Sequence, residues 1–160
     1  MPTKDEIDQI AANNFHSVTF KSATESKNSW IDWHLVPMTR PVINPPTQKT
    51  STVDIPGADG VIDLSEVVSG KPVYNNRTGS IEFLVQNGFK EWSDMFSTVM
   101  AYLNGSKKKI IFNDDPNYYY EGRVWVSKWD SSSSIHYSKI TVDYDVGPYK
   151  YTLDGKTKML

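Results

Sequence analysis

The sequence predicts a mainly β protein: a β-sandwich or split barrel with one packed amphipathic helix at about 90–104, a long proline-rich arm and a short N-terminal helix. Three observations lead to this class. Trp, Tyr and Phe supply 12% of the 160 residues, and aromatic side chains favour strands. Polar and apolar residues alternate over several short segments separated by turn-forming residues, as in antiparallel sheets. Residues 90–104 carry a complete apolar stripe at helical spacing.

The composition excludes several function classes. Lysine and arginine number 17 against 19 acidic residues, for a net charge of −2, whereas a general electrostatic binder of nucleic acid needs a basic face. The chain has no cysteine, which excludes disulfides, thiolate zinc sites and a cysteine nucleophile. The apolar runs are too short for a transmembrane helix or a signal peptide, so we expect no membrane anchor.

The N-terminal residues predict a short helix over 4–13. Thr3 and Glu6 have the spacing of a capping box, and Ile7, Ile10 and Ala11 follow at helical spacing. A helix this short is marginal alone and must dock on something. We therefore expect residues 1–14 to form a helical extension and residues 15–160 to form a single β domain.

The next segments predict two strands followed by a long irregular stretch. Alternation from Phe15 indicates a first strand, and residues 30–36 suit a second. Four prolines then fall within residues 37–50. Because proline lacks an amide donor and presets an extended backbone, this stretch is an arm or a long loop rather than a central strand. Two interpretations stay open, a disordered surface loop and an arm that contacts a partner.

The middle of the chain predicts short strands before the main helix. Residues 51–55 and 61–64 are brief strands around a turn at 56–60, and 79–86 alternates as a half-buried strand. The helix carries one apolar stripe and ends at Gly105, and the stripe indicates core packing rather than a cofactor site. Its residues are Trp92, Phe96, Val99 and Leu103.

Three strands are expected to close the chain, over 109–112, 118–129 and 135–146. The turn between the first two contains Asp114, Asp115 and Pro116, whose side chains shape such bends. A serine-rich hairpin loop at 130–134 joins the last two strands.

No motif for catalysis, a cofactor or a metal emerges. The three histidines are scattered, and neither a nucleophile elbow nor a phosphate loop is present. Asp114, Asp115 and Glu121 could form a carboxylate pair for glycoside hydrolysis, but turn formation accounts for the two aspartates. Tyr118, Tyr119 and Tyr120 could stack on sugars, although alternation along a strand places at most two of them on one face. We expect no enzyme and no cofactor.

Several pieces, taken in order, resemble the N-terminal domain of siphophage distal tail proteins. They are Ile55-Pro-Gly-Ala-Asp-Gly-Val-Ile-Asp-Leu64, Asn76-Arg77, Leu103-Asn-Gly105, Asp114-Asp-Pro-Asn-Tyr-Tyr-Tyr-Glu-Gly-Arg123 and Pro148-Tyr-Lys150. The resemblance spans residues 15–150. It implies a β-sandwich with one helix, of which six copies close into a ring at the tip of a phage tail.

Such a ring would connect the tail tube protein to the baseplate, through a tail-associated hub or fibre protein, and leave a channel for DNA that passes without specific binding. The resemblance therefore implies a virion tail protein, from a phage or prophage, assembled in the bacterial host cytoplasm, with no catalytic residues. The alternatives are a carbohydrate-binding β-sandwich module in host-surface recognition and a small hydrolase. The candidate subunit or partner contacts are Pro37, Arg40, Pro41, Pro45, Pro46, Asn76, Arg77, Tyr119 and Arg123.

Overall fold

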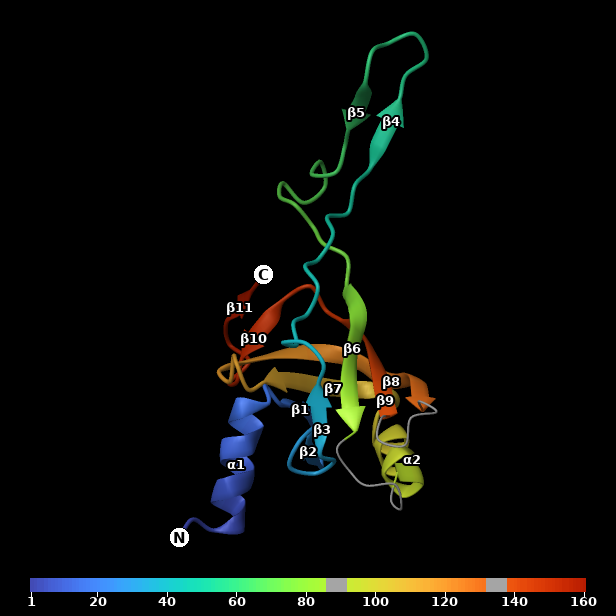
Figure 1. Ribbon diagram of the computed structural model, residues 1–160. Coiled ribbons are helices and arrows are strands. Elements are labelled where there is room, and N and C mark those ends of the chain that lie inside the picture. Colours follow the sequence, from blue (N-terminus) through green and yellow to red (C-terminus); the bar gives the residue numbers. More distant parts are fainter. Residues whose placement is uncertain (86–91, 132–137) are drawn as a thin grey trace.

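The computed structural model describes residues 1–85, 92–131 and 138–160 and is mainly β (Figure 1). The two helices are α1 (Lys4–Asn14) and α2 (Trp92–Tyr102). The first strands are β1 (Val18–Lys21), β2 (Ser26–Asn28), β3 (Leu35–Pro37), β4 (Thr52–Asp54), β5 (Val61–Asp63) and β6 (Arg77–Val85). The later strands are β7 (Asn104–Phe112), β8 (Tyr118–Ser131), β9 (Ser138–Val146), β10 (Lys150–Thr152) and β11 (Lys158–Met159).

One antiparallel sheet forms the body, with strand order β2-β1-β7-β8-β9-β6-β3. The β10–β11 hairpin is added at the start of β8, while β4 and β5 pair apart from this sheet. The turn between β2 and β3 ties the two sheet edges together, because the Leu35 amide donates to the Ser29 carbonyl at 2.7 Å and the Ser29 amide donates to Val18 at 2.8 Å. The curled sheet confirms the predicted fold class.

The core lies inside this curl, under α2. Its most buried side chains come from the sheet and from the helix stripe, and they are Val18, Phe20, Leu35, Phe83, Val99, Leu103, Ile110, Val124, Ile140, Val142, Tyr144 and Val146. Val99 and Leu103 are essentially inaccessible, and Phe96 is partly buried against the same core, which confirms core packing for these three stripe residues. The predicted loop at 130–134 is wrong in its first two positions, because β8 continues through Ser131. Several other predicted positions lie outside the described residues, namely helix residues 90 and 91, strand residue 86 and residues 132–137.

The predicted strand over 30–36 is wrong in its first half. Residues 29–33 form a turn, and the strand begins only at Leu35. The cause is Asn28, whose side-chain oxygen accepts the amides of Trp30 at 3.0 Å and Ile31 at 3.1 Å, while Asp32 accepts the Asn28 amide at 2.7 Å. Such local side-chain bonds compete with a sheet ladder.

The predicted strand over 109–112 in fact begins at Asn104, directly after α2. Gly105 has φ +90°, a conformation that glycine adopts without a steric cost, and the pairing register shifts between Asn104 and Lys107. The lysine run concealed this strand. Lys108 nevertheless points inward and is 6% exposed, with its Nζ 4.8 Å from the centre of the Tyr102 ring.

The proline-rich stretch is a loop, as predicted, but it lies against the sheet. Pro41 and Ile43 are buried, and the Asn44 amide donates to the Tyr144 hydroxyl at 2.9 Å. Pro37 ends β3, an edge strand, where a missing amide is tolerated. The element that projects from the body is instead the β4–β5 hairpin (Figure 1).

Candidate assembly surfaces

The β4–β5 hairpin is the most prominent candidate contact surface. Residues 49–72 are all exposed except Ser65, which is half-buried. Each strand has three residues, and a two-stranded hairpin alone in water is marginally stable at best. The hairpin therefore gains little stability from contacts with its own chain, and its surface is available for contact with another chain.

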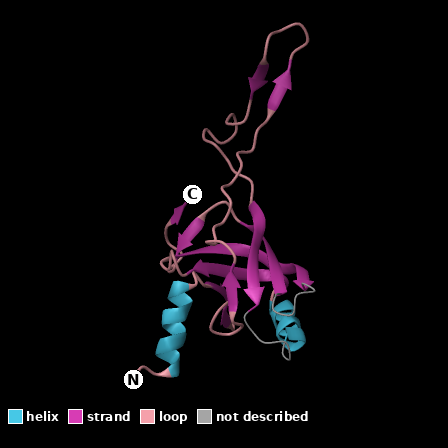
Figure 2. Ribbon diagram, in the orientation of Figure 1, coloured by secondary structure: helices cyan, strands magenta, loops and turns pink. Residues whose placement is uncertain are grey.

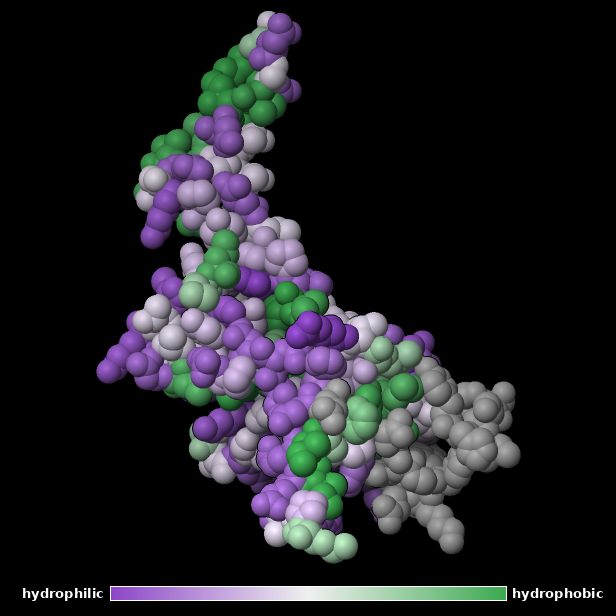
Figure 3. All heavy atoms as spheres, turned by 60° about the vertical axis from the view of Figure 1, so that its left-hand side comes forward, coloured by the Kyte–Doolittle hydropathy of each residue, from purple (hydrophilic) through white to green (hydrophobic). Residues whose placement is uncertain are grey.

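The hairpin is amphipathic. Val53 pairs with Ile62 on one face, whereas Thr52 pairs with Asp63 and Asp54 pairs with Val61 on the other. Ile55 and Leu64 continue the apolar face just beyond the strand ends. The exposed fractions of Val53, Ile55, Ile62 and Leu64 are 45%, 43%, 48% and 39%. Figure 3 shows apolar surface gathered along the hairpin, away from the body.

Several backbone bonds join the two arms of the hairpin at its base. Gln48 and Tyr74 form a bridge between the two arms of the loop. The Lys49 amide donates to the Val73 carbonyl, and the Asn75 amide to the Thr47 carbonyl, each at 2.8 Å. The two arms are thus held together where the hairpin leaves the body.

Helix α1 is a second exposed element (Figure 2). The capping box predicted from Thr3 and Glu6 is present. Ile7 and Ile10 are 52% and 57% exposed, so the apolar side of the helix is left open to solvent. The chain is anchored beyond the C-terminal end of α1, where the Phe15 ring lies 4.7 Å from the ring of Trp30.

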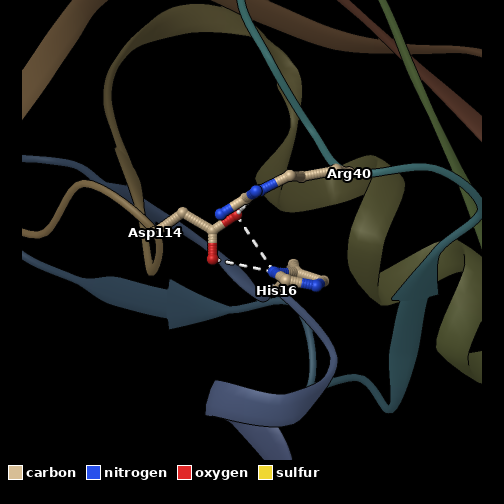
Figure 4. A network of polar contacts seen from close by, with 3 residues as sticks. All are labelled: His16, Arg40 and Asp114. Atoms are coloured by element: carbon tan, nitrogen blue, oxygen red, sulfur yellow. Dashed lines mark hydrogen bonds and ion pairs between the residues drawn. The ribbon is translucent and has the colours of Figure 1, made fainter.

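A polar cluster joins three distant segments (Figure 4). Asp114, in the turn after β7, accepts from Nε of Arg40 at 2.7 Å and lies 2.7 Å from Nδ1 of His16. Because a carboxylate only accepts, the proton between Asp114 and His16 is on the imidazole nitrogen. We call these three residues the Asp114 clamp, since they hold the proline-rich loop and the start of the β domain to the same turn.

The clamp sets the charge state of Asp114. Burial of the carboxyl would raise its pKa, but the hydrogen bonds and positive charges of His16 and Arg40 outweigh this and lower the pKa below its ordinary value. Its neighbour Asp115 is held separately, by Lys150 at 2.6 Å. Both aspartates of the hydrolase alternative therefore serve as structural ties.

The predicted contact residues divide into exposed and buried ones. Those with exposed side chains are Arg40, Pro45, Asn76 and Arg123, and those at least half-buried are Pro37, Pro41, Pro46, Arg77 and Tyr119. The structure brings Arg40 to the clamp, but Arg77 lies inside, with its Nε donating to the Pro148 carbonyl at 2.9 Å. Asn76 donates to Asp145 at 2.9 Å, and Arg123 donates to the Gly105 carbonyl at 3.1 Å. Whether a partner uses the exposed four stays a prediction.

The tyrosines proposed as a sugar platform are engaged within the chain. Tyr119 is 8% exposed, stacks on Tyr151 at 5.6 Å and has the Lys109 ammonium 4.5 Å from its centre. The ammonium of Lys150 lies 4.4 Å from the centre of the Tyr118 ring. Tyr119 is therefore not available for stacking on a ligand.

The sequence interpretation missed the clamp. It predicted the two strands and the turn of the hairpin, which are confirmed, but not that the hairpin projects from the body. His16 and Asp114 are 98 positions apart, so no local spacing joins them. The hairpin left a usable signal, because two short alternating strands around Pro56-Gly57 carry apolar residues that the body does not cover. Over 1–85, 92–131 and 138–160 there is no cluster of potential metal ligands and no helix long and apolar enough to cross a membrane.

Comparison with known proteins gives an informative structural match. No family model and no curated protein matches the sequence. The structure is similar to that of the SPP1 Dit (gp 19.1) protein, described as a paradigm of the hub adsorption apparatus in phages that infect Gram-positive bacteria. The TM-score is 0.55 at 19% identity, over 84% of this chain and 52% of SPP1 Dit. The chain thus spans about half the length of that protein, and the resemblance to distal tail proteins is confirmed for the fold.

Proposed function

We propose that this protein is a structural component of a phage or prophage tail tip. In this role, copies of the chain form a ring that connects the tail tube to the baseplate and its tail-associated proteins, and DNA passes through the central channel. The observation that carries the proposal is the fold shared with SPP1 Dit over 84% of the chain.

The exposed hairpin supports a role in assembly. Its apolar face has no cover within the described part of the chain, and exposed apolar surface of this kind marks sites of protein contact. A ring needs two different complementary surfaces on each subunit, because head-to-tail contacts close by rotation. An element that projects from the body can supply one of them.

The near balance of charge supports the DNA channel. With a net charge of −2, the chain has no overall attraction for phosphate that would retard a passing duplex.

The mass of the purified protein in solution tests this proposal. Light scattering combined with negative-stain imaging of the same fraction should give closed rings of about six times the 18.2 kDa chain mass. A variant with Val53 and Ile62 both replaced by threonine should form fewer rings at equal concentration. The matched control, Met100→Ala on α2, removes an exposed apolar side chain elsewhere and should leave them intact.

A clean monomer at high concentration, with no ring on the images, would contradict the proposed ring. If the threonine variant forms rings equally well, the proposed ring still stands, but the apolar face of the hairpin does not contribute to it.

A further inference from the structure

A basic patch lies on the outer face of the sheet, across β1, β7 and β8. Lys21 and Lys109 are partners in the β1–β7 register, and Lys107 lies on the same face two positions along β7. A depression of about 410 Å³ at this place is lined by these three lysines, Ser22, Ala23 and Glu121, among others. We call Lys21, Lys107 and Lys109 the lysine patch.

The lysine patch is unfavourable for the stability of the sheet. Like charges directly opposite each other on neighbouring strands are destabilising, yet Lys21 faces Lys109. Glu121 is the next partner in this row. None of the three ammonium groups forms an ion pair with a described residue, although that of Lys109 also lies over the Tyr119 ring. Departures of this kind are expected where a surface serves function.

The β4–β5 hairpin has the opposite charge. Between residues 50 and 70 the acidic residues are Asp54, Asp59, Asp63 and Glu66, with no lysine or arginine among them. Asp54 and Asp63 lie on the face opposite the apolar one, and the residues around them are exposed. The chain, almost neutral as a whole, therefore separates its charge between a projecting acidic hairpin and a basic patch on the body.

The geometry favours contact between two copies. The hairpin points away from its own body (Figure 1), so it leaves its own lysine patch uncovered. From Gln48 to the turn at Gly57 it reaches roughly 30 Å, at about 3.3 Å per residue of extended chain. That is about the diameter expected for a body of this size, so the hairpin can cross to an adjacent subunit.

We propose that the acidic face of the β4–β5 hairpin of one copy docks on the lysine patch of a second copy. The inference rests on the proposed ring of identical subunits and identifies the two surfaces that join. A polyanion such as duplex DNA fits the patch less well, because Glu121 lies within it and Asp145 faces Arg123 beside it.

The absence of cysteine permits a direct test by cross-linking. One chain carries Ala58→Cys in the hairpin turn, another carries Ala23→Cys beside the patch, and the two are mixed with a short bismaleimide. A linked dimer should form, and it should weaken as salt is added because exposed charges are screened. The matched control replaces Ala23→Cys with Ala101→Cys, an exposed position on α2, and should yield about tenfold less product.

Charge reversal and its rescue complete the test. The patch variant K21E/K107E should lower the yield of linked dimer about tenfold, because like charges then face each other. The hairpin variant D54K/D59K/E66K should do the same; Asp63 is kept because it accepts the Ser65 amide at 2.9 Å. Mixing the two variants should restore the yield to within about threefold of the starting pair. The control variant K4E/K156E changes the net charge by the same amount as K21E/K107E but outside the patch, and it should leave the yield of linked dimer unchanged.

Three results would overturn the inference. If rings persist and the charge variants cross-link normally, the hairpin and the lysine patch are not the surfaces that join the subunits, and the proposed function still stands. A failure of all cross-links together with a monomeric mass would overturn both. Loss of duplex DNA binding in K21E/K107E, without any dimer in the starting pair, would assign the patch to a polyanion instead.

Discussion

Replacing Asp114 with asparagine should destabilise the body by releasing the proline-rich loop from the β7–β8 turn. The Asp114 side chain is 20% exposed, whereas those of His16 and Arg40 are 43% and 69% exposed. Hydrogen bonds to charged groups contribute about 1.5–3 kcal/mol each, and exposed ion pairs contribute about 0.2–1 kcal/mol. Because both partners are well solvated, we expect D114N to lose about 1–2 kcal/mol of unfolding free energy.

The pH dependence of this loss identifies its cause. The pKa of Asp114 is lower in the folded chain than in the unfolded one. Its carboxylate therefore stabilises the fold fully above the unfolded value of about 3.9, and this stabilisation is lost as the pH falls through the folded value. The difference between the natural chain and D114N should therefore be present at about pH 5 and should shrink as the pH falls below the unfolded value of about 3.9.

Urea unfolding followed by tryptophan fluorescence measures this difference, at protein concentrations low enough to keep both chains in the same state of association. The control is Asp59→Asn, an exposed aspartate in the hairpin turn, which should leave the unfolding free energy unchanged. A D114N chain within about 0.3 kcal/mol of the natural one at pH 7 would refute the account of the clamp. A difference that does not shrink as the pH falls below about 3.9 would show that the charge of Asp114 is not its source.

Three further predictions concern the core, a close backbone contact and the hairpin. Leu103→Ala, at a fully buried position, should cost about 2–5 kcal/mol in urea unfolding, against less than about 0.5 kcal/mol for exposed Met100→Ala. Gly122→Ala would place a Cβ 2.2 Å from a carbonyl oxygen of β9 and should cost at least about 2 kcal/mol, whereas Gly147→Ala, with its nearest atom at 3.9 Å, should unfold at nearly the natural urea concentration. Ile62→Thr in the hairpin should leave the monomer's thermal midpoint unchanged and lower the ring fraction seen by light scattering; a lower midpoint would show that the hairpin packs on its own body.

The sequence predicted the elements whose pattern is set by the core. The α2 stripe was recognised because Val99 and Leu103 must both face the sheet, and such burial imposes a period. The strand prediction was wrong at Trp30. There the side chain of Asn28 accepts the backbone amide and holds the chain in a turn, although the apolar run itself suits a strand. The start of β7 was also predicted wrongly. Lys108 occupies an inward position of this strand with its aliphatic stem buried, and only its charged end needs a polar partner, so the run of lysines does not show the usual alternation of polar and apolar residues.

The candidate site was harder to predict than the core, for a physical reason. Core residues are selected by the chain's own packing, so their period can be recognised in one sequence. The Asp114 clamp depends on three side chains brought together by the completed sheet, and the hairpin depends on contacts that its own chain does not supply. Val53 and Ile62 pair across two short strands and stay 45% and 48% exposed, with no described residue covering them, so their side chains contribute little to the stability of the isolated chain. The acidic and apolar faces of this hairpin contribute binding free energy only when another molecule lies against them.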